Sequence, residues 1–305
     1  MSNDSRPLRI AITGATGFLG RALVARLAAR GHSPVPITRH RDGAGRDAIL
    51  WDPERGELHP QALAGIDAVV HLAGENLAQR WTDEAKRKIR DSRVKSTELL
   101  ARTIAAMERA PRTWLSGSAV GIYGDRGDEL LDESSPRGQG FLADVATAWE
   151  NATAGAKRGD VRIVHLRTGL VLDESGGALA KMLPPFRLGL GGRIGSGQQI
   201  LSWIALDDWT RAVEHLLGAG QTSGPVNLVA PTPVSNADFA HALGHALGRP
   251  ALIPIPETAV RLAFGEMGEA TLLASQRVVP TRLLGSGFGF EYETIDAALE
   301  AAVRS

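Results

Sequence analysis

Apolar residues near the start of the chain follow two different periods, with glycines between them. Residues 8–13 form a mostly apolar run that is typical of a buried strand, whereas residues 21–30 repeat apolar positions at the spacing of a helix. The glycines Gly14, Gly17 and Gly20 separate the two segments. The pattern therefore predicts a strand, a tight turn and a helix in succession.

A strand, a glycine turn and a helix form the setting in which nucleotide phosphates are bound. Gly14 permits the sharp turn, Gly17 lets a pyrophosphate approach the backbone, and Gly20 lets the helix pack closely on the strand. The free N–H groups and the dipole of the helix would then face the phosphates. We predict a dinucleotide site here, against the alternative of a purely structural turn. Its residues are Gly14, Thr16, Gly17, Phe18, Leu19 and Gly20.

Apolar runs and helical periods continue to alternate downstream, which predicts an α/β domain built on a parallel sheet. Strands are expected at residues 32–38, 48–51, 67–72, 113–119, 161–172, 200–206 and 225–229, and helices at residues 83–107, 141–156, 207–217 and 235–247. Thr82 and Ser235 are expected to cap the helices that follow them, and Asp207 and Asp208 to cap the helix that ends at residue 217.

The character of the sequence changes after residue 175. A pair of prolines at 184–185 is expected to break a short helix, and five glycines fall within residues 189–197. No buried strand is predicted before this second glycine cluster, so we interpret it as a flexible loop and not as a second nucleotide site. We expect a core over residues 1–175, to which strands and helices return from about 200–230, and a smaller part over residues 176–305.

The overall composition is that of an ordinary globular protein and excludes several classes of function. Of 305 residues, 43% are hydrophobic and 22% are charged, and the formal net charge is zero, so we expect neither nucleic acid nor a membrane as partner. The absence of cysteine excludes disulfides, thiolate metal sites and cysteine nucleophiles. Neither a signal peptide nor an apolar run of about 18 residues is evident, so we expect a cytoplasmic protein with a small-molecule substrate.

The end of the second strand indicates which nucleotide is bound. Sites for NAD usually place an acidic residue there to accept from the ribose 2′-hydroxyl. Here Thr38 is followed by Arg39, and no acid occurs before Asp42. A guanidinium suits a 2′-phosphate, because it offers paired, charge-assisted hydrogen bonds. We therefore expect NADP(H) in preference to NAD(H), the alternative being a solvated loop of basic side chains.

Several motifs resemble those of the extended short-chain dehydrogenase/reductases, which include sugar-nucleotide epimerases and dehydratases. They are residues 13–20, 71–74, 118–124 and 167–172. More narrowly, the chain is similar to an atypical, epimerase-like subgroup that ends in a domain of unknown function, on residues 73–76, 91–94, 186–192, 196–199, 202–204 and 275–280. The resemblance implies a Rossmann-like, doubly wound parallel sheet with a smaller mixed α/β C-terminal part facing the substrate, and the domain of unknown function at about 250–300.

The resemblance also implies which further residues lie beside the cofactor. These are Arg39, Leu72, Ala73 and Arg93, with Lys88 as an additional candidate. From the residues themselves, small residues such as Gly74 at the end of the predicted strand at 67–72 let a cofactor lie across the sheet, and Glu75, which follows, is a further candidate. The resemblance is compatible with a homodimer.

One feature of the family is missing. Its typical members carry a Tyr-x-x-x-Lys pair, in which the lysine lowers the tyrosine pKa and the phenol moves the substrate's proton. The two tyrosines here are Tyr123 and Tyr292, and the residues four positions later are Gly127 and Asp296. The helix predicted at 141–156 contains no tyrosine, and no lysine stands where the pair requires one.

Other residues are therefore candidates for chemistry. Ser118 could hydrogen-bond a substrate carbonyl or be satisfied by the backbone, and Tyr123 could be a displaced acid or a packing residue. We expect Asp144 and Glu150 to be exposed or ion-paired, and His71 to lie in the core. No grouping of histidines with acids predicts a metal.

The sequence leads to one principal hypothesis and two rivals. The principal one is an NADP(H)-dependent oxidoreductase with a non-standard proton donor, or with none from the protein. The first rival is a non-catalytic NADP(H)-binding sensor or scaffold. Epimerisation or dehydration ranks lowest, because those reactions rely on the absent tyrosine.

Overall fold

A seven-stranded parallel sheet forms the centre of the protein. The computed structural model describes residues 6–40, 47–156 and 161–303. The strand order is β11-β7-β5-β4-β1-β2-β3, and every neighbouring pair is parallel. The strands are β1 (Arg9–Thr13), β2 (Ser33–Thr38), β3 (Ile49–Leu50), β4 (Ala68–His71), β5 (Thr113–Ala119), β7 (Arg162–Thr168) and β11 (Gly224–Leu228). This order confirms the predicted Rossmann-like α/β fold.

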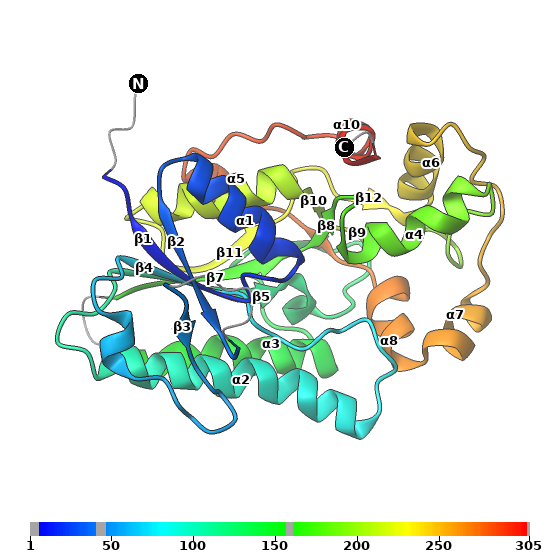
Figure 1. Ribbon diagram of the computed structural model, residues 1–305. Helices are drawn as coiled ribbons and strands as arrows, with labels where there is room; N and C mark the ends of the chain where they lie inside the picture. Colours follow the sequence, from blue (N-terminus) through cyan, green and yellow to red (C-terminus); the bar gives the residue numbers. More distant parts are fainter. Residues whose placement is uncertain (1–5, 41–46, 157–160, 304–305) are drawn as a thin grey trace.

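Helices cover both faces of the sheet (Figure 1). One face carries α1 (Phe18–Ala29) and α5 (Leu206–Gly218), and a buried cluster that includes Ile12, Leu27 and Val213 fills the space beneath them. The other face carries α2 (Asp83–Ala105) and α3 (Phe141–Asn151), which cover a second cluster around Trp114 and Leu100. Parallel strands buried on both faces explain why the sequence shows apolar runs instead of strict alternation.

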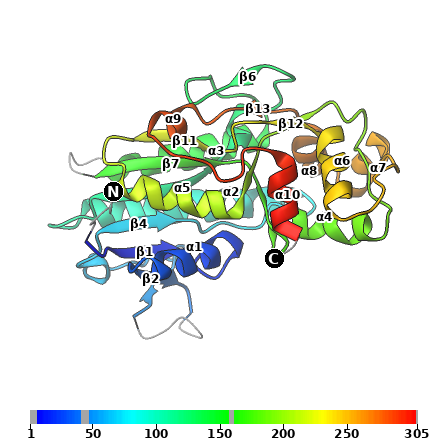
Figure 2. The same cartoon turned by 90° about the horizontal axis from the view of Figure 1, so that it is seen from above.

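Most of the remaining elements gather beyond the carboxyl ends of the strands (Figures 1 and 2), whereas α9 (Thr281–Gly285) packs beside the edge strand β11. Two short pairings, β8 (Leu170–Leu172) with β10 (Trp203–Ala205) and β9 (Ile200–Leu201) with β12 (Val234–Ser235), extend from the sheet region. A third pairing joins β6 (Leu130–Leu131) to β13 (Arg277–Val278). The helices beyond the strand ends are α4 (Gly177–Arg187), α6 (Asn236–Ala246), α7 (Glu257–Phe264), α8 (Glu266–Gly268) and α10 (Ile295–Val303). None of the helices in the described ranges is long and apolar enough to cross a membrane.

Most local predictions hold, and the exceptions have identifiable causes. Thr82 and Ser235 cap α2 and α6, each by accepting a hydrogen bond from the backbone N–H three residues later. The prediction for Asp207 and Asp208 is wrong: they lie inside the first turn of α5, because Ala205 is the cap. The proline pair at 184–185 does not break α4, which continues to Arg187, since the prolines occupy its last turn and remove few helical hydrogen bonds.

Two other elements end or divide earlier than predicted. The strand expected at 200–206 is divided at Ser202, whose hydroxyl hydrogen-bonds the β13 segment. The helix expected at 141–156 changes to a 3₁₀ helix at Ala152.

Candidate functional site

The turn between β1 and α1 has the geometry of a phosphate cradle. Gly14 adopts a positive φ of 67°, and Gly17 N donates to Gly14 O at 3.0 Å. A Cβ atom on Gly20 would lie 2.1 Å from Gly14 O, so only glycine lets the helix start this close to the turn. Gly17 is the N-cap residue of α1 and has no side chain to accept hydrogen bonds from the first turn of the helix. The N–H groups of that turn are therefore left for a ligand.

The cradle opens at the point where the sheet reverses its winding direction. From β1 the chain continues outward to β2 and β3, then crosses back to β4 on the other side of β1. Ligands of doubly wound sheets bind in the crevice outside the carboxyl ends of two such strands. Gly14 lies against the segment that leaves β4, since a Cβ on Gly14 would be 3.0 Å from Leu72 C and 3.1 Å from Ala73 N. The structure thus brings the predicted residues of both segments together.

A threonine holds the two sides of the crevice in register. Thr13 Oγ1 accepts hydrogen bonds from Leu72 N at 3.0 Å and from Ala73 N at 3.1 Å. Thr13 is the last residue of β1 and is fully buried. The Thr13 side chain, which is not among the predicted cofactor residues, therefore fixes the cradle to the segment after β4.

Arg93 on α2 places a buried positive charge beside this crevice. The residue is only 9% exposed, and its guanidinium lies so close to Gly74 that a Cβ there would be 3.0 Å from Cζ. Its Nη1 donates to Ile89 O, and the guanidinium lies over the Trp149 ring, 5.2 Å from the centroid. Burial lowers the pKa of Arg93 to about 10, so it remains a cation at neutral pH.

No carboxylate in the described ranges lies within 4.0 Å of the Arg93 guanidinium. The charge of Glu75 favours the Arg93 cation without forming an ion pair with it, so much of the cost of burial is left for an anionic ligand to offset. The cradle and Arg93 together fit a dinucleotide, whose phosphates carry negative charge.

Of the other predicted cofactor residues, Arg39 and Glu75 follow the ends of β2 and β4, whereas Lys88 is ion-paired on α2. Arg39 is exposed directly after β2, where Thr38 Oγ1 donates to His40 O at 3.0 Å, and no ion pair joins Arg39 to another described residue. Glu75 is exposed next to Gly74, and its N–H donates to Ser92 Oγ. Lys88 instead lies on the solvent side of α2, with Nζ 2.7 Å from Glu84 Oε1. Asp42 lies outside the described residues.

Phe18 links the cradle to the C-terminal part. A Cβ on Gly176 would lie 2.5 Å from the Phe18 ring, and one on Gly177 would lie 3.1 Å from it. The ring therefore lies against the backbone where α4 begins. Sequence reasoning placed Phe18 in the cradle but missed this contact, because the two segments are far apart in the chain.

On α3, the helix on which the family's tyrosine and lysine would lie, Trp149 and Glu150 are neighbours near the C-terminal end. Glu150 is held by Arg167 through two hydrogen bonds, Nε to Oε1 at 2.8 Å and Nη2 to Oε2 at 3.0 Å. Ser118 Oγ donates to Glu150 Oε1 at 2.6 Å. Glu150 is thus ion-paired, one of the two states expected for it. Ser118 is satisfied by a side chain, which neither reading of the sequence anticipated.

Tyr123 belongs to the same network and is fully buried. Its hydroxyl donates to Asn227 Oδ1 at 2.8 Å and accepts from Arg167 Nη1 at 2.9 Å. Burial raises the pKa of Tyr123, which the charge and hydrogen bond of Arg167 only partly oppose. The Tyr123 phenol is buried, has a raised pKa and makes two hydrogen bonds through its oxygen. Its role is therefore structural, because these bonds join β7 to β11.

An aromatic corner lies where α2, α3 and α8 meet. The rings of Trp81 and Phe141 pack edge to face with centroids 4.9 Å apart, and Lys86 Nζ lies 5.3 Å from the centre of the Phe141 ring. Lys86 also forms an ion pair with Glu266, and Met267 packs on the same cluster. This corner joins the core to the segment that follows α7.

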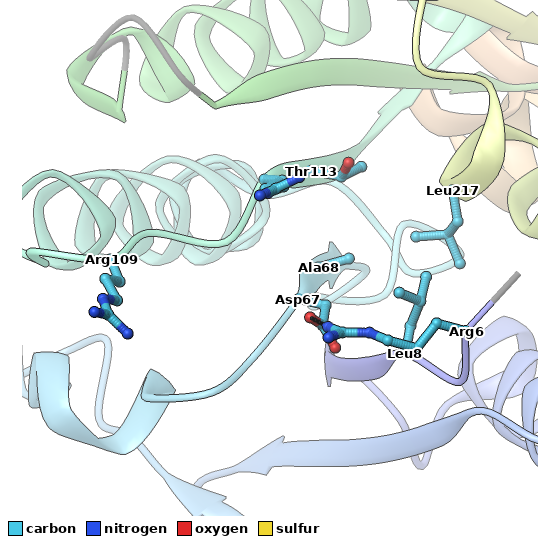
Figure 3. Close-up of a pocket in the computed structure, with 8 residues that line it drawn as sticks. Arg6, Leu8, Asp67, Ala68, Arg109, Thr113 and Leu217 are labelled. Carbon is cyan, nitrogen blue, oxygen red and sulfur yellow. Dashed lines mark hydrogen bonds and ion pairs between the residues drawn. The ribbon is translucent and has the colours of Figure 1, made fainter.

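A hollow of about 630 Å³ lies at the opposite edge of the sheet (Figure 3). Its walls come from residues that precede or begin β4 and β5, including Asp67 and Thr113, together with Arg109 and Arg112. Figure 3 shows Arg6 beside Asp67, with which it pairs at 2.5 Å. None of the predicted cofactor residues lines this hollow.

The chain matches known families along most of its length. Residues 10–228 match the NAD dependent epimerase/dehydratase family, and residues 255–302 match a domain of unknown function, DUF1731. The epimerase family protein Mb2239 of Mycobacterium bovis is 44% identical over 291 residues, which cover 95% of this chain and 96% of that protein.

Two solved structures are similar over nearly the whole chain. The crystal structure of human epimerase family protein SDR39U1 (isoform 2) with NADPH has a TM-score of 0.91 and 38% identity, covering 97% of this chain and 99% of that one. The nucleoside-diphosphate sugar epimerase of Corynebacterium glutamicum has a TM-score of 0.79 and 39% identity, covering 98% of this chain and 58% of that one.

Proposed function

The chain belongs to the NAD dependent epimerase/dehydratase family, and from this membership we propose that it binds NADP(H) and acts as an oxidoreductase on a small-molecule substrate. The membership, with the C-terminal DUF1731 match, confirms the resemblance to the epimerase-like subgroup. The observation that carries the proposal is the cradle at Gly14, Gly17 and Gly20, where a Cβ added to Gly20 would lie only 2.1 Å from Gly14 O. A backbone constrained in this way leaves room for a pyrophosphate.

Two features support NADP(H) over NAD(H). Arg39 follows the end of β2 as an exposed guanidinium, in the place where an acidic residue would accept from a ribose hydroxyl. The human relative with 38% identity was crystallised with NADPH. Arg93, buried beside Gly74, would add a second cation for the phosphates or for a charged substrate.

The nicotinamide supplies hydride chemistry when it is bound. Of the residues considered for chemistry, Tyr123 is buried with its hydroxyl engaged on both sides, and Glu150 is clamped by Arg167, so neither is free to move a proton. The proposal therefore assigns the protein reductions or oxidations in which positioning is the main contribution of the protein and solvent supplies or takes the proton.

The test is turnover by the purified protein with NADPH and a panel of carbonyl compounds and activated alkenes. We expect NADPH oxidation above the buffer rate with at least one member. Bound NADPH without turnover on any member would instead favour the second candidate, a non-catalytic NADP(H) sensor or scaffold. The observation that favours this candidate is α3 itself, which carries tryptophan and a clamped glutamate and has no Tyr-x-x-x-Lys pair.

A further inference from the structure

The Ser118 hydroxyl has one proton, which it donates in a hydrogen bond to Glu150. Ser118 Oγ lies 2.6 Å from Glu150 Oε1, a distance typical of a hydrogen bond to a charged oxygen. A carboxylate can only accept, so the serine must be the donor in this contact. The hydroxyl then has only its lone pairs left for any other partner.

Glu150 is fixed as a carboxylate. Its side chain is 12% exposed, and Arg167 holds both of its oxygens. Burial raises the pKa of Glu150, but the hydrogen bonds and charge of Arg167 outweigh it and leave the pKa below its usual value. His165, the other titratable group facing it, has Nδ1 3.7 Å from Oε2. The carboxylate neither turns away from Ser118 nor takes up a proton at neutral pH.

Ser118 stands at the part of β5 that borders the crevice. The pairing of β4 with β5 ends at His71 opposite Ser116, whereas the pairing of β5 with β7 continues to Ala119 opposite Thr168. The three residues from Gly117 to Ala119 therefore extend beyond β4 on the side of the predicted cofactor. This placement gives the lone pairs of Ser118 Oγ a route to a ligand.

We propose that Ser118 is a hydrogen-bond acceptor towards the bound ligand, and that Glu150 is the positioning residue that sets this polarity. The inference rests on the proposed function, since it assumes a nicotinamide nucleotide in the crevice. The group that faces Ser118 must carry an N–H or an O–H, which is either the carboxamide of the cofactor or a hydroxyl of the substrate. A ligand that presents a carbonyl oxygen there finds no donor in Ser118.

The cofactor arm of the test uses calorimetry with NADPH and with its 3-acetylpyridine analogue, which replaces the amide N–H₂ by a methyl group. If the carboxamide is the donor, the wild-type protein binds NADPH about five- to tenfold more tightly than the analogue, which is the usual effect of one hydrogen bond. Ser118→Ala removes that preference. Ser116→Ala is the matched control, because Ser116 lies on the same strand, is fully buried and has a hydroxyl without a partner among the described residues.

The substrate arm repeats the comparison with the NADP-bound protein and pairs of secondary alcohols and their ketones, read by thermal shift. If a substrate hydroxyl is the donor, the protein prefers alcohols, and Ser118→Ala loses that preference while Ser116→Ala keeps it. Glu150→Gln, which weakens the hold on the serine proton, reduces whichever preference is present. Circular dichroism establishes that each variant is folded.

Two results overturn the inference alone. One is a preference that Ser118→Ala leaves unchanged in both arms. Another is a preference for the ketone over the alcohol, which would make Ser118 the donor, or tighter binding of the acetylpyridine analogue, which would show that Ser118 accepts no hydrogen bond from the carboxamide. Normal NADPH binding with either result leaves the proposed function standing, whereas a protein that binds no NADPH overturns both.

Discussion

Thr13 Oγ1 lies 2.7 Å from His71 Nδ1, and this contact joins the ends of β1 and β4 at the crevice. Two backbone N–H groups already donate to Thr13 Oγ1, so the hydroxyl itself donates a hydrogen bond to Nδ1 of the imidazole. On the other side of the ring, Nε2 lies 3.0 Å from Thr97 Oγ1, which donates its own proton to Arg93 O. His71 is therefore the neutral tautomer with its proton on Nε2.

The first prediction concerns the pH dependence of stability. Burial, with a smaller contribution from Arg93, lowers the pKa of His71 from 6.5 to about 3. Below pH 6.5 His71 is protonated in the unfolded chain but stays neutral in the folded one. The free energy of unfolding therefore decreases as the pH falls from 6.5 towards 3. Urea unfolding at pH 7.5 and pH 5.0 should show a larger loss for the wild-type protein than for His71→Gln. Equal losses would mean that His71 is protonated in the fold.

The second prediction concerns the closest backbone approach in the cradle. In Gly20→Ala the new methyl group meets Gly14 O, which is backbone and cannot move aside without opening the turn. We expect a loss of about 1–3 kcal/mol in the free energy of unfolding, as for other overpacked sites, and NADPH binding too weak to measure by calorimetry. Gly218→Ala is the control: nothing lies within 4 Å of the added Cβ at the end of α5, so binding should be unchanged. Full NADPH affinity in Gly20→Ala would contradict the role of the cradle.

The third prediction separates the 2′-phosphate from the rest of the cofactor. Arg39→Ala should weaken NADPH binding roughly tenfold to a hundredfold, because a charge-assisted hydrogen bond contributes about 1.5–3 kcal/mol. NADH affinity should not change, since NADH lacks the phosphate. Arg109→Ala, at the opposite edge of the sheet, is the control. An equal effect of Arg39→Ala on both nucleotides would show that the guanidinium does not read the 2′-phosphate.

The fourth prediction distinguishes structure from catalysis at Tyr123. Tyr123→Phe removes the hydrogen-bond partner of both Arg167 Nη1 and Asn227 Oδ1. The free energy of unfolding should therefore fall by about 1–3 kcal/mol, the usual cost of leaving buried polar atoms unpaired. NADPH affinity, measured by calorimetry, should stay within twofold of the wild-type value, on the order of the error of such a comparison. A folded, fully stable variant that loses all turnover would instead make Tyr123 the proton donor.

The sequence could predict the cradle and the sheet because their signals are local. The strand that ends at Thr13 and the helix that starts at Phe18 each show their period within a few residues, and the glycines stand between them. Parallel pairing then follows from the alternation of strands and helices.

The centre of the candidate site could not be predicted in the same way. Ser118 and Glu150 are 32 residues apart in the sequence, and Tyr123 and Asn227 are 104 residues apart. No local pattern could therefore predict either hydrogen bond. Asp208 shows the same limit: its position suggested a helix cap, but its carboxylate accepts from Glu291 N and Tyr292 N, more than 80 residues away. Contacts of this kind depend on the whole fold, whereas capping and glycine turns depend on neighbours in the chain.

The measurement that tests the central claim most directly is a calorimetric titration of the purified wild-type protein with NADPH and, separately, with NADH. The account predicts saturable binding of one NADPH per chain and weaker binding of NADH. The absence of binding by either nucleotide to the folded protein would contradict it.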